Sequence, residues 1–331
     1  MKQAILDAPG RFSIVDVPIP ELAPGQVLVK VAACGVCTSE LDVWDGSTGG
    51  AGLPRAIGHE VSGVVDDLAQ GVAGLERGDA VGVWVTGGGF AEYVAVDASW
   101  CYSAACVPLD LALAEPVACA VNAVEMADPK LGDDVVIIGA GFMGHLVHKL
   151  VALRGPRQII VADTRPDALE IATLVGATRV VDVTREPLNE VVKSLTGGRG
   201  SDVTFEVTGT QAALSVAGEV TRMSGAIAIV GYHQSGGGDR TIPLAHWNWM
   251  AFRIANAHFR GEQVIRHGME VGMRLMTSGR LDLSDVVTHR FPLGDIARAF
   301  ETAHTKPVGF AKATVVVAPD LAEHESTEKR G

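Results

Sequence analysis

The sequence predicts an α/β protein in which a β-rich domain accompanies a doubly wound parallel sheet. Short apolar runs broken by Gly and Asp fill roughly the first 115 residues, and such spacing of strands and turns is typical of a barrel-like β unit. After Pro116, short aliphatic runs alternate with stretches of helix length. That alternation predicts a parallel sheet with helices on both faces.

Length, charge and cysteine content narrow the class of protein. A chain of 331 residues is long enough for two domains. Its net charge of −12 argues against nucleic acid or an anionic membrane surface as a partner, since both attract clustered Lys and Arg. No signal-peptide core and no membrane-length apolar run is present. Five cysteines without the spacing of a disulfide framework indicate a reducing, cytoplasmic setting.

The β-rich part begins with apolar runs that are each bounded by turn residues. "QVLVKVAACGV" and "VSGVVDDLAQGV" are two such runs. "GDAVGVWVTGGGFAEYVAV" predicts two strands around a glycine-rich turn.

The alternating part begins with the strand "VVII", a glycine turn and a helix. "QIIVADTRPDALEIATLVGA" repeats strand and helix, and three further buried strands are predicted at "RVVDV", "DVTFEVTG" and "AIAIVGY". A last helix is predicted in "QVIRHGMEVGMRLMTSG" and a last strand in "FAKATVVVA". The polar tail, residues 319–331, is expected to be disordered.

The glycine turn carries the first functional signal. Gly139, Gly141 and Gly144 form a GxGxxG pattern between a predicted strand and a predicted helix, which is the context that dinucleotide binding requires. The first Gly permits a tight turn, the second lets the backbone approach a pyrophosphate, and the third lets helix and strand pack closely. Phe142 and Met143 lie inside the same turn. The helix N-terminus offers free N–H groups to the phosphates.

Asp163 ends the next predicted strand, 24 residues after Gly139, where an acidic residue is expected to hold the adenosine ribose hydroxyls. A carboxylate there favours NAD, because it repels the 2′-phosphate of NADP. Arg165, two residues on, could bind that phosphate, so NADP stays a less favoured alternative. A packing turn without ligand and a methyl-donor nucleotide fold are the remaining alternatives.

The second signal is the set of metal-binding residue types in the β-rich part. Cys37 and His59 offer a thiolate and an imidazole, and Glu60 or Glu115 could supply a carboxylate. Zinc prefers such ligands, and a catalytic zinc takes about three of them and leaves one position open. Two alternatives stay open for the Cys-x-x-Cys pair that begins at Cys34: a thioredoxin-like redox pair and half of a structural zinc site.

Other candidate residues have simpler interpretations. Cys34 is expected to be a small buried residue, and the remaining three cysteines to be thiols without a role. His145 and His148 are expected on the helix surface. The aromatic segment 246–260 is interpreted as a core stripe, with a subunit interface or pocket wall as the alternative.

These motifs stand in an order that resembles a known family. "CGVCTSE", "GHEVSGVV", "GDAVGV", "GGFAEYV", "AEPVACAVNAV", "VVIIGAGFMG" and "FEVTG" together resemble the zinc-containing medium-chain dehydrogenase/reductases, in the alcohol and polyol dehydrogenase group of sorbitol and threonine type. The resemblance covers about residues 1–318. Several motifs in order are far more specific than any one of them.

The resemblance implies a particular domain order. It implies a GroES-like catalytic domain formed by residues 1–116 and 260–318, with a Rossmann domain of residues 117–259 inserted. Zinc and nicotinamide are implied to meet between these domains. Thr208 and Val230, together with the glycine that follows each, end later strands of the Rossmann sheet, where loops face the cofactor. Plain turn chemistry is the alternative for these positions.

The resemblance also assigns roles in the metal site. Cys37 and His59 match zinc ligands, and Glu60 matches a group that is a ligand in some members and a neighbouring, swing-in group in others. Glu115 stands where alcohol dehydrogenases have a third Cys ligand and polyol-type relatives have Glu, which shifts the expected substrate toward polyols, sugars or cyclitols.

Two further residues match catalytic positions, and two family features are missing. Ser39 matches the hydroxyl that receives the substrate proton, and Glu40 matches the acidic partner that orients the zinc histidine. The four-cysteine lobe of many relatives is deleted after "GDAV", so one catalytic zinc and no structural zinc is expected. Asp42 replaces the proton-relay histidine, which leaves the relay in doubt.

The predicted activity is hydride transfer between a secondary alcohol and a nicotinamide cofactor, in a homodimer or homotetramer. One alternative is a zinc-free reductase of quinones or enones with the same fold, and the joint presence of Cys37, His59 and Glu60 argues against it. The other is a non-catalytic nucleotide-binding structural or sensor protein, against which Ser39 and the ligand set also argue.

Overall fold

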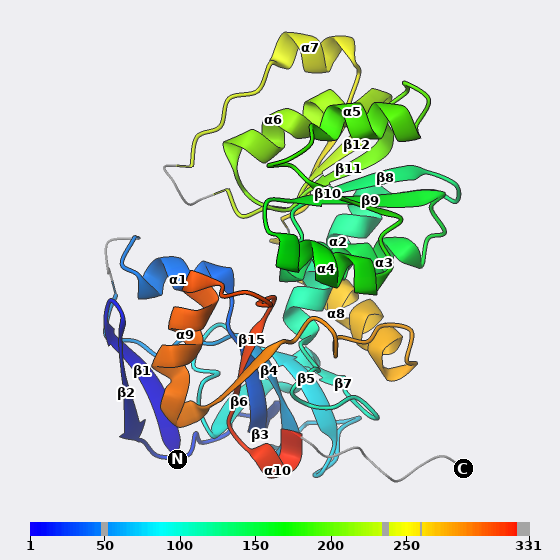
Figure 1. Ribbon diagram of the computed structural model, residues 1–331. Helices are drawn as coiled ribbons and strands as arrows, with labels where there is room; N and C mark the ends of the chain where they lie inside the picture. Colours follow the sequence, from blue (N-terminus) through cyan, green and yellow to red (C-terminus); the bar gives the residue numbers. More distant parts are fainter. Residues whose placement is uncertain (48–51, 234–237, 259, 323–331) are drawn as a thin grey trace. The chain divides into compact units, whose positions relative to one another are not determined.

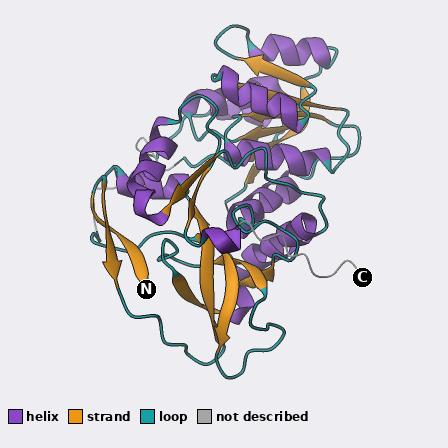
Figure 2. Ribbon diagram, turned by 60° about the horizontal axis from the view of Figure 1, so that its bottom comes forward, coloured by secondary structure: helices purple, strands orange, loops and turns teal. Residues whose placement is uncertain are grey.

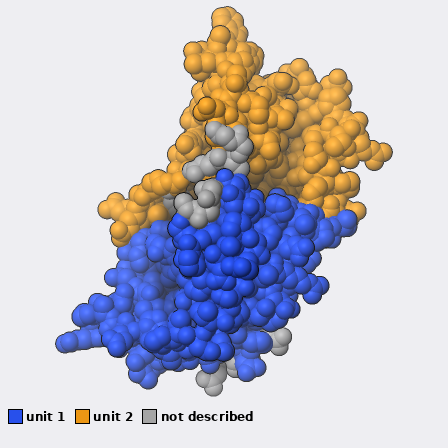
Figure 3. Space-filling model, turned by 90° about the vertical axis from the view of Figure 1, so that its left-hand side faces the viewer, with its two compact units in different colours: residues 1–118, 266–331 blue, residues 119–265 orange. Residues whose placement is uncertain are grey.

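The computed structural model describes residues 1–47, 52–233, 238–258 and 260–322, and it divides the chain into two compact units. Unit 1 comprises Met1–Ala118 and the chain from Arg266 onward, and unit 2 comprises Cys119–Ile265 (Figure 3). Each unit contains its own sheet. The chain enters unit 2 within helix α2 and leaves it within helix α8, so both boundaries fall inside helices rather than in loops.

Unit 1 is built around a seven-stranded sheet. Six strands follow the order β14-β15-β3-β4-β5-β7, and β6 pairs with β3 on the side of that path (Figure 1). A separate two-stranded sheet joins β1 to β2. The strands are β1 (Lys2–Ala8), β2 (Arg11–Asp16), β3 (Gln26–Gly35), β4 (Glu60–Leu68), β5 (Ala80–Trp84), β6 (Tyr93–Asp97), β7 (Cys101–Ser103), β14 (His289–Pro292) and β15 (Ala313–Val316).

The helices of unit 1 and of its boundaries are mostly short. They are α1 (Thr38–Trp44), the 3-10 turn η1 (Ala98–Trp100), α2 (Ala114–Ala127), α8 (Glu262–Thr277), the 3-10 turn η2 (Leu293–Asp295), α9 (Ile296–Thr305) and α10 (Pro319–Ala322). Helix α10 lies inside the segment that was expected to be disordered. Its last residue, Ala322, is buried, which explains why this end of the tail is ordered. Residues 323–331 lie outside the described part of the chain.

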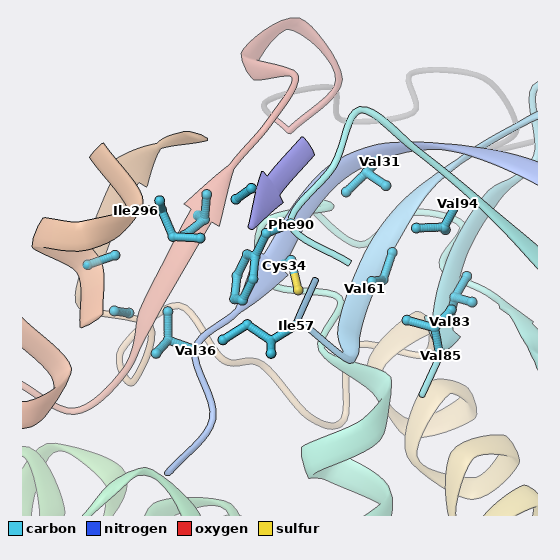
Figure 4. Close-up of a cluster of buried hydrophobic side chains, with 14 of the residues drawn as sticks. Val31, Cys34, Val36, Ile57, Val61, Val83, Val85, Phe90, Val94 and Ile296 are labelled. Carbon is cyan, nitrogen blue, oxygen red and sulfur yellow. The ribbon is translucent and has the colours of Figure 1, made fainter. Parts of the chain in front are cut away.

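The core of unit 1 is aliphatic. Strand β3 is buried along almost its whole length because β15, β4 and β6 all pair with it. Figure 4 shows Cys34 among Val36, Ile57 and Phe90 in this core. Burial raises the pKa of the Cys34 thiol well above its usual value, so it stays neutral. Cys34 is therefore a small apolar residue of the core, as the sequence predicts.

Unit 2 is a six-stranded parallel sheet with helices on both faces (Figures 1 and 2). The strands lie in the order β10-β9-β8-β11-β12-β13, so the chain adds β9 and β10 on one side of β8 and then adds β11, β12 and β13 on its other side. All strands stay parallel. The strands are β8 (Asp134–Ile138), β9 (Gln158–Asp163), β10 (Arg179–Asp182), β11 (Ser201–Glu206), β12 (Thr221–Ile229) and β13 (Arg253–Asn256). The helices are α3 (Phe142–Ala152), α4 (Pro166–Val175), α5 (Leu188–Leu195), α6 (Gln211–Val220) and α7 (Leu244–Trp249). The predicted fold class, a β-rich domain with a doubly wound parallel sheet, is confirmed.

Two expectations for unit 2 need correction or refinement. His145 and His148 are predicted on the helix surface, but both are buried, as are most other residues of α3. The aromatic segment is mixed in character: Trp247 is buried in the core of unit 2, whereas Trp249 is 76% exposed. Among the described residues, no helix is both long enough and apolar enough to span a membrane.

Candidate functional site

Antiparallel pairing of β3 with β4 brings three potential metal ligands together in unit 1. Gly35, the last residue of β3, pairs with Glu60, the first residue of β4. Cys37 follows two residues after Gly35 and caps the start of α1, while His59 immediately precedes β4. Ligand atoms of Cys37, His59 and Glu60 all lie within 4.8 Å of one another. Among the residues that the structure describes, this is the one cluster of three or more such groups.

A glycine is needed beside this cluster. A Cβ atom added at Gly35 would lie 1.9 Å from Glu60 Oε2. No real Cβ tolerates such a contact, so any larger residue would push the Glu60 carboxylate away from the cluster. Glycine is therefore required at position 35, in the "CGVC" segment, because the Glu60 carboxylate occupies the space that a side chain would need.

Glu40 orients the histidine of the cluster. Its Oε1 lies 2.9 Å from His59 Nδ1 and accepts a hydrogen bond from the backbone N–H of Gly58 at 2.7 Å. The carboxylate is almost fully buried on α1. A proton on Nδ1 that is held by Glu40 leaves Nε2 with its lone pair, which is the form of imidazole that binds a metal.

The charges around His59 favour a cation. Burial alone lowers the pKa of His59, but the Glu40 carboxylate and hydrogen bonds to Cys37 and Glu40 outweigh it and raise this pKa to about 12. An imidazole in such a setting is surrounded by groups that attract positive charge. A divalent metal is attracted by the same groups.

Lys312 also contacts the cluster, and the sequence analysis does not single it out. Its ammonium is buried just before β15, and Nζ lies 2.8 Å from Glu60 Oε1 and 2.6 Å from Oε2. It also donates to the carbonyl of Val36 at 2.9 Å. Burial by itself lowers the pKa of Lys312, but the charges of Glu60 and Cys37 outweigh this effect. The net pKa is raised above its usual value, so the side chain stays charged. A single lysine inside the apolar run "FAKATVVVA" was the signal that could have identified it.

The other predicted residues of this site lie at different distances from the cluster. Ser39 Oγ donates to Cys37 Sγ at 3.3 Å, so the hydroxyl lies beside a predicted ligand. Glu115 is half-buried in the first turn of α2 and does not join the cluster, although its charge contributes to raising the pKa of Lys312. Asp42 is half-buried on α1, and burial followed by repulsion from Asp45 raises its pKa.

The donor set fits zinc. A thiolate, an imidazole and a carboxylate are ligands that zinc accepts, and three of them leave a fourth position for water or substrate. All five cysteines are free thiols, so Cys37 is available for ligation. The cluster therefore has the composition of a catalytic rather than a closed structural metal site.

The glycine turn of unit 2 fits a pyrophosphate. Gly139 follows β8 with a positive φ of 112°, and a Cβ at Gly144 would lie 1.9 Å from the carbonyl oxygen of Gly139. Gly141 differs from both, because no heavy atom lies within 4 Å of the position its Cβ would take. Packing explains the first and last glycines, whereas Gly141 leaves open space at the start of α3, where a phosphate can approach the backbone. Phe142 and Met143 form the first turn of this helix and are half-buried.

The acidic residue of the second strand lies next to this turn. Asp163 ends β9, and its Oδ2 accepts a hydrogen bond from Ala140 N–H at 2.6 Å. Its Oδ1 accepts from Arg165 N–H at 2.9 Å. The Arg165 guanidinium is paired with Asp167, through Nε to Oδ1 at 3.3 Å and through a second contact from Nη2 to Oδ2. The charge of Arg165 is thus largely balanced by a neighbouring carboxylate.

The turns that follow β11 and β12 pack directly against each other. Thr208 and Gly209 lie after β11, and Val230 and Gly231 lie after β12. A Cβ on Gly231 would lie 2.1 Å from Gly209 N, so glycine is required at this contact. Sequence reasoning had selected these positions but could not show that they touch.

Comparisons with known proteins match the N-terminal and the middle parts of the chain to dehydrogenase families. Residues 23–108 match the alcohol dehydrogenase GroES-like domain family, and residues 143–270 match the zinc-binding dehydrogenase family. The L-threonine 3-dehydrogenase of Ruegeria pomeroyi is 29% identical, over 87% of this chain and 91% of its own length. Human sorbitol dehydrogenase is 26% identical, over 90% and 91%.

A solved structure agrees with these relatives. The 2R,3R-butanediol dehydrogenase of Bacillus subtilis is 26% identical and superposes with a TM-score of 0.82, covering 96% of this chain and 99% of its own. The similarity therefore extends over both units of the chain.

Proposed function

Because this chain is a zinc-containing medium-chain dehydrogenase/reductase of the alcohol and polyol group, we propose that it oxidises a secondary alcohol of the polyol, sugar or cyclitol class with NAD as the hydride acceptor. The observation that carries the proposal is the cluster of Cys37, His59 and Glu60, whose ligand atoms lie within 4.8 Å of one another. The names of the relatives, which include sorbitol and threonine dehydrogenases, support the substrate class.

The residues of unit 1 have distinct tasks in this proposal. Zinc, when bound, supplies a Lewis acid for the substrate oxygen, and the nicotinamide supplies the acceptor for hydride. Cys37, His59 and Glu60 hold the metal, and Glu40 keeps His59 in the tautomer that can bind it. Ser39, whose hydroxyl lies 3.3 Å from Cys37 Sγ, accepts a hydrogen bond from the substrate hydroxyl and takes its proton while its own hydroxyl proton passes outward to solvent.

The residues of unit 2 hold the cofactor. The backbone of the turn from Gly139 to Gly144 binds the pyrophosphate, and Asp163 binds the adenosine ribose. Asp163 favours NAD because its carboxylate repels a 2′-phosphate. The pairing of Arg165 with Asp167 adds to that preference, since the guanidinium is already engaged by a carboxylate.

The proposal includes one zinc per chain and a cytoplasmic homodimer or homotetramer. The deletion of the four-cysteine lobe supports the single zinc, because the remaining thiols are not paired in sequence as structural zinc ligands are. Five free cysteines are consistent with a reducing compartment.

Metal analysis tests the proposal. We expect about one zinc per chain in the wild-type protein and near zero in Cys37→Ser, with Cys101→Ser as the matched control that retains its zinc. The same purified proteins are assayed with NAD and NADP against a panel of polyols, sugars and cyclitols. A wild type without zinc, or without activity on any of these substrates, would overturn the proposal.

Two further variants test the carboxylate ligand. Glu60→Gln is expected to lower the zinc content more than Glu115→Gln, because Glu60 belongs to the cluster and Glu115 does not. The reverse order would assign the third ligand to Glu115.

A further inference from the structure

A buried carboxylate in unit 2 is used by none of the roles described so far. Glu206 is the last residue of β11 and is fully buried. Its Oε1 accepts three hydrogen bonds from the turn that follows: from Thr208 N–H at 2.8 Å, from Thr208 Oγ1 at 2.6 Å and from Gly209 N–H at 2.9 Å. A carboxylate oxygen that accepts three donors fixes the shape of this turn.

The other oxygen of the same carboxylate reaches a second segment. His233 Nε2 lies 2.7 Å from Glu206 Oε2. Arg240 Nε donates to His233 Nδ1 at 3.1 Å, and since an arginine can only donate, Nδ1 must be the acceptor. The proton of His233 is then on Nε2, where it is donated to Glu206. We name these three residues the Glu206 cluster.

The Glu206 cluster also joins the two turns through the backbone. Arg240 Nη2 donates to the carbonyl of Gly209 at 3.0 Å. The N–H groups of Val230 and Gly231, at the end of β12, donate to the main-chain oxygen of Glu206 at 2.8 and 2.9 Å. Glu206 thus holds both turns: its side chain binds the turn after β11, and its main-chain oxygen binds the turn after β12.

The topology of the sheet shows which half of a dinucleotide these turns face. The strand order reverses between β8 and β11, and a dinucleotide lies across such a reversal with its pyrophosphate at the glycine turn. Asp163, on β9, places the adenosine half on one side of β8. The nicotinamide half must then lie on the opposite side, over the ends of β11 and β12.

We propose that Glu206, His233 and Arg240 are positioning residues for the nicotinamide half of the cofactor. They act through the turns at Thr208–Gly209 and Val230–Gly231, whose shape they set before the cofactor binds. This inference rests on the proposed function, because it presumes a nicotinamide dinucleotide. It predicts that damage to the cluster weakens binding of the whole dinucleotide but not of its adenosine half.

The test compares His233→Leu with His233→Gln. Leucine removes both ring nitrogens, whereas glutamine retains an amide N–H for Glu206 Oε2 and an oxygen that can accept from Arg240. Dissociation constants are measured for NADH, by fluorescence, and for ADP, which is the adenosine half of the cofactor with its pyrophosphate, by calorimetry. Arg240→Met provides the same test at a half-buried position if His233→Leu does not fold.

We expect His233→Leu to raise the dissociation constant for NADH about tenfold and to leave that for ADP within about twofold. His233→Gln is expected to restore most of the NADH binding. Equal weakening of both ligands, or no change in either, would overturn the inference. A wild-type protein that bound neither NADH nor ADP would instead overturn the proposed function, and the inference with it.

Discussion

At the scale of single residues, Lys312 is the least expected feature of the site. A fully buried lysine is rare unless a carboxylate pairs with it, and Glu60 contacts it through both oxygens. Lys312 reaches this position because β15 pairs with β3 and thereby lies beside the "CGVC" segment. The ion pair holds both carboxylate oxygens of Glu60 at the buried ammonium and so restricts the movement of this side chain.

Removing one partner of this pair leaves the other as an unpaired buried charge. We expect Lys312→Met to destabilise the metal-free protein by about 3–5 kcal/mol. The double variant Lys312→Met with Glu60→Gln is expected to recover most of that loss, because no unpaired charge remains. Urea unfolding of the chelator-treated wild type, the two single variants and the double variant gives the four free energies of unfolding of this double-mutant cycle. Losses that simply add in the double variant would show that the two side chains are not coupled.

His145 is a second buried ionisable residue, in helix α3. Burial is the main reason that its pKa is lowered to about 3, and the positive charges of His148, Lys149 and Arg165 lower it further. Both of its ring nitrogens are buried without a hydrogen-bond partner. The side chain is therefore neutral in the folded protein at neutral and mildly acidic pH.

The lowered pKa of His145 predicts a pH dependence of stability. Above about pH 6.5, its usual pKa, the residue is neutral in both the folded and the unfolded chain. As the pH falls from 6.5 toward 3, only the unfolded chain takes up the proton, so the folded state loses about 1.4 kcal/mol per pH unit. His145→Leu should make the unfolding midpoint less sensitive to acid in this range. An unchanged acid sensitivity in urea titrations between pH 7 and pH 4 would contradict this prediction.

At the scale of elements, the strand β8, the glycine turn and helix α3 act as one unit. Gly144 is required by packing, since its Cβ would lie 1.9 Å from Gly139 O. Gly141 has an ordinary φ of −77° and open space around its Cβ position. The two glycines therefore have different reasons to be glycine.

This difference predicts opposite results for two alanine variants. Gly141→Ala is expected to cost less than about 1 kcal/mol of stability, as an N-cap change without a clash, yet to weaken NADH binding about tenfold because the methyl group occupies the phosphate space. Gly144→Ala is expected to lose about 1–3 kcal/mol of stability through overpacking. Urea unfolding and NADH titration of both variants distinguish the two cases. A stable Gly144→Ala with normal binding would disprove the packing argument.

At the scale of the whole molecule, the proposed metal ligands and the proposed cofactor residues come from different units. Cys37, His59 and Glu60 lie in unit 1, whereas the glycine turn and Asp163 lie in unit 2. Each unit has its own sheet and its own aliphatic core, and the proposed dinucleotide contacts in unit 2 are made by residues other than the proposed metal ligands.

Metal removal tests this separation. A chelator is expected to abolish dehydrogenase activity while the dissociation constant for NADH stays within about threefold of its original value, because none of the proposed dinucleotide contacts belongs to the metal ligands. Re-addition of zinc should restore the activity. Loss of NADH binding in the chelated protein would show that the metal organises unit 2 as well.

Sequence reasoning was most successful where a local pattern carries a local reason. The strand–turn–helix context of Gly139–Gly144, the acidic end of β9 and the buried Cys34 all follow from spacing and residue type. It failed for His145 and His148, because helical spacing shows that they share a face but not that this face is covered. It also missed α10, because the polar composition of the tail does not show that Ala322 is buried.

The sequence alone thus determined the α/β class, the dinucleotide turn and the residue types of a zinc site, since these depend on neighbours in the chain. Only the tertiary structure decided which groups meet: Lys312 lies 252 positions from Glu60, and Arg240 lies 31 positions from Gly209. Such contacts arise from strand pairing and from the order of strands in each sheet, which local patterns do not specify. The tertiary structure also decided which ionisable side chains are buried. The charge of such a side chain depends on the partners that the fold brings to it.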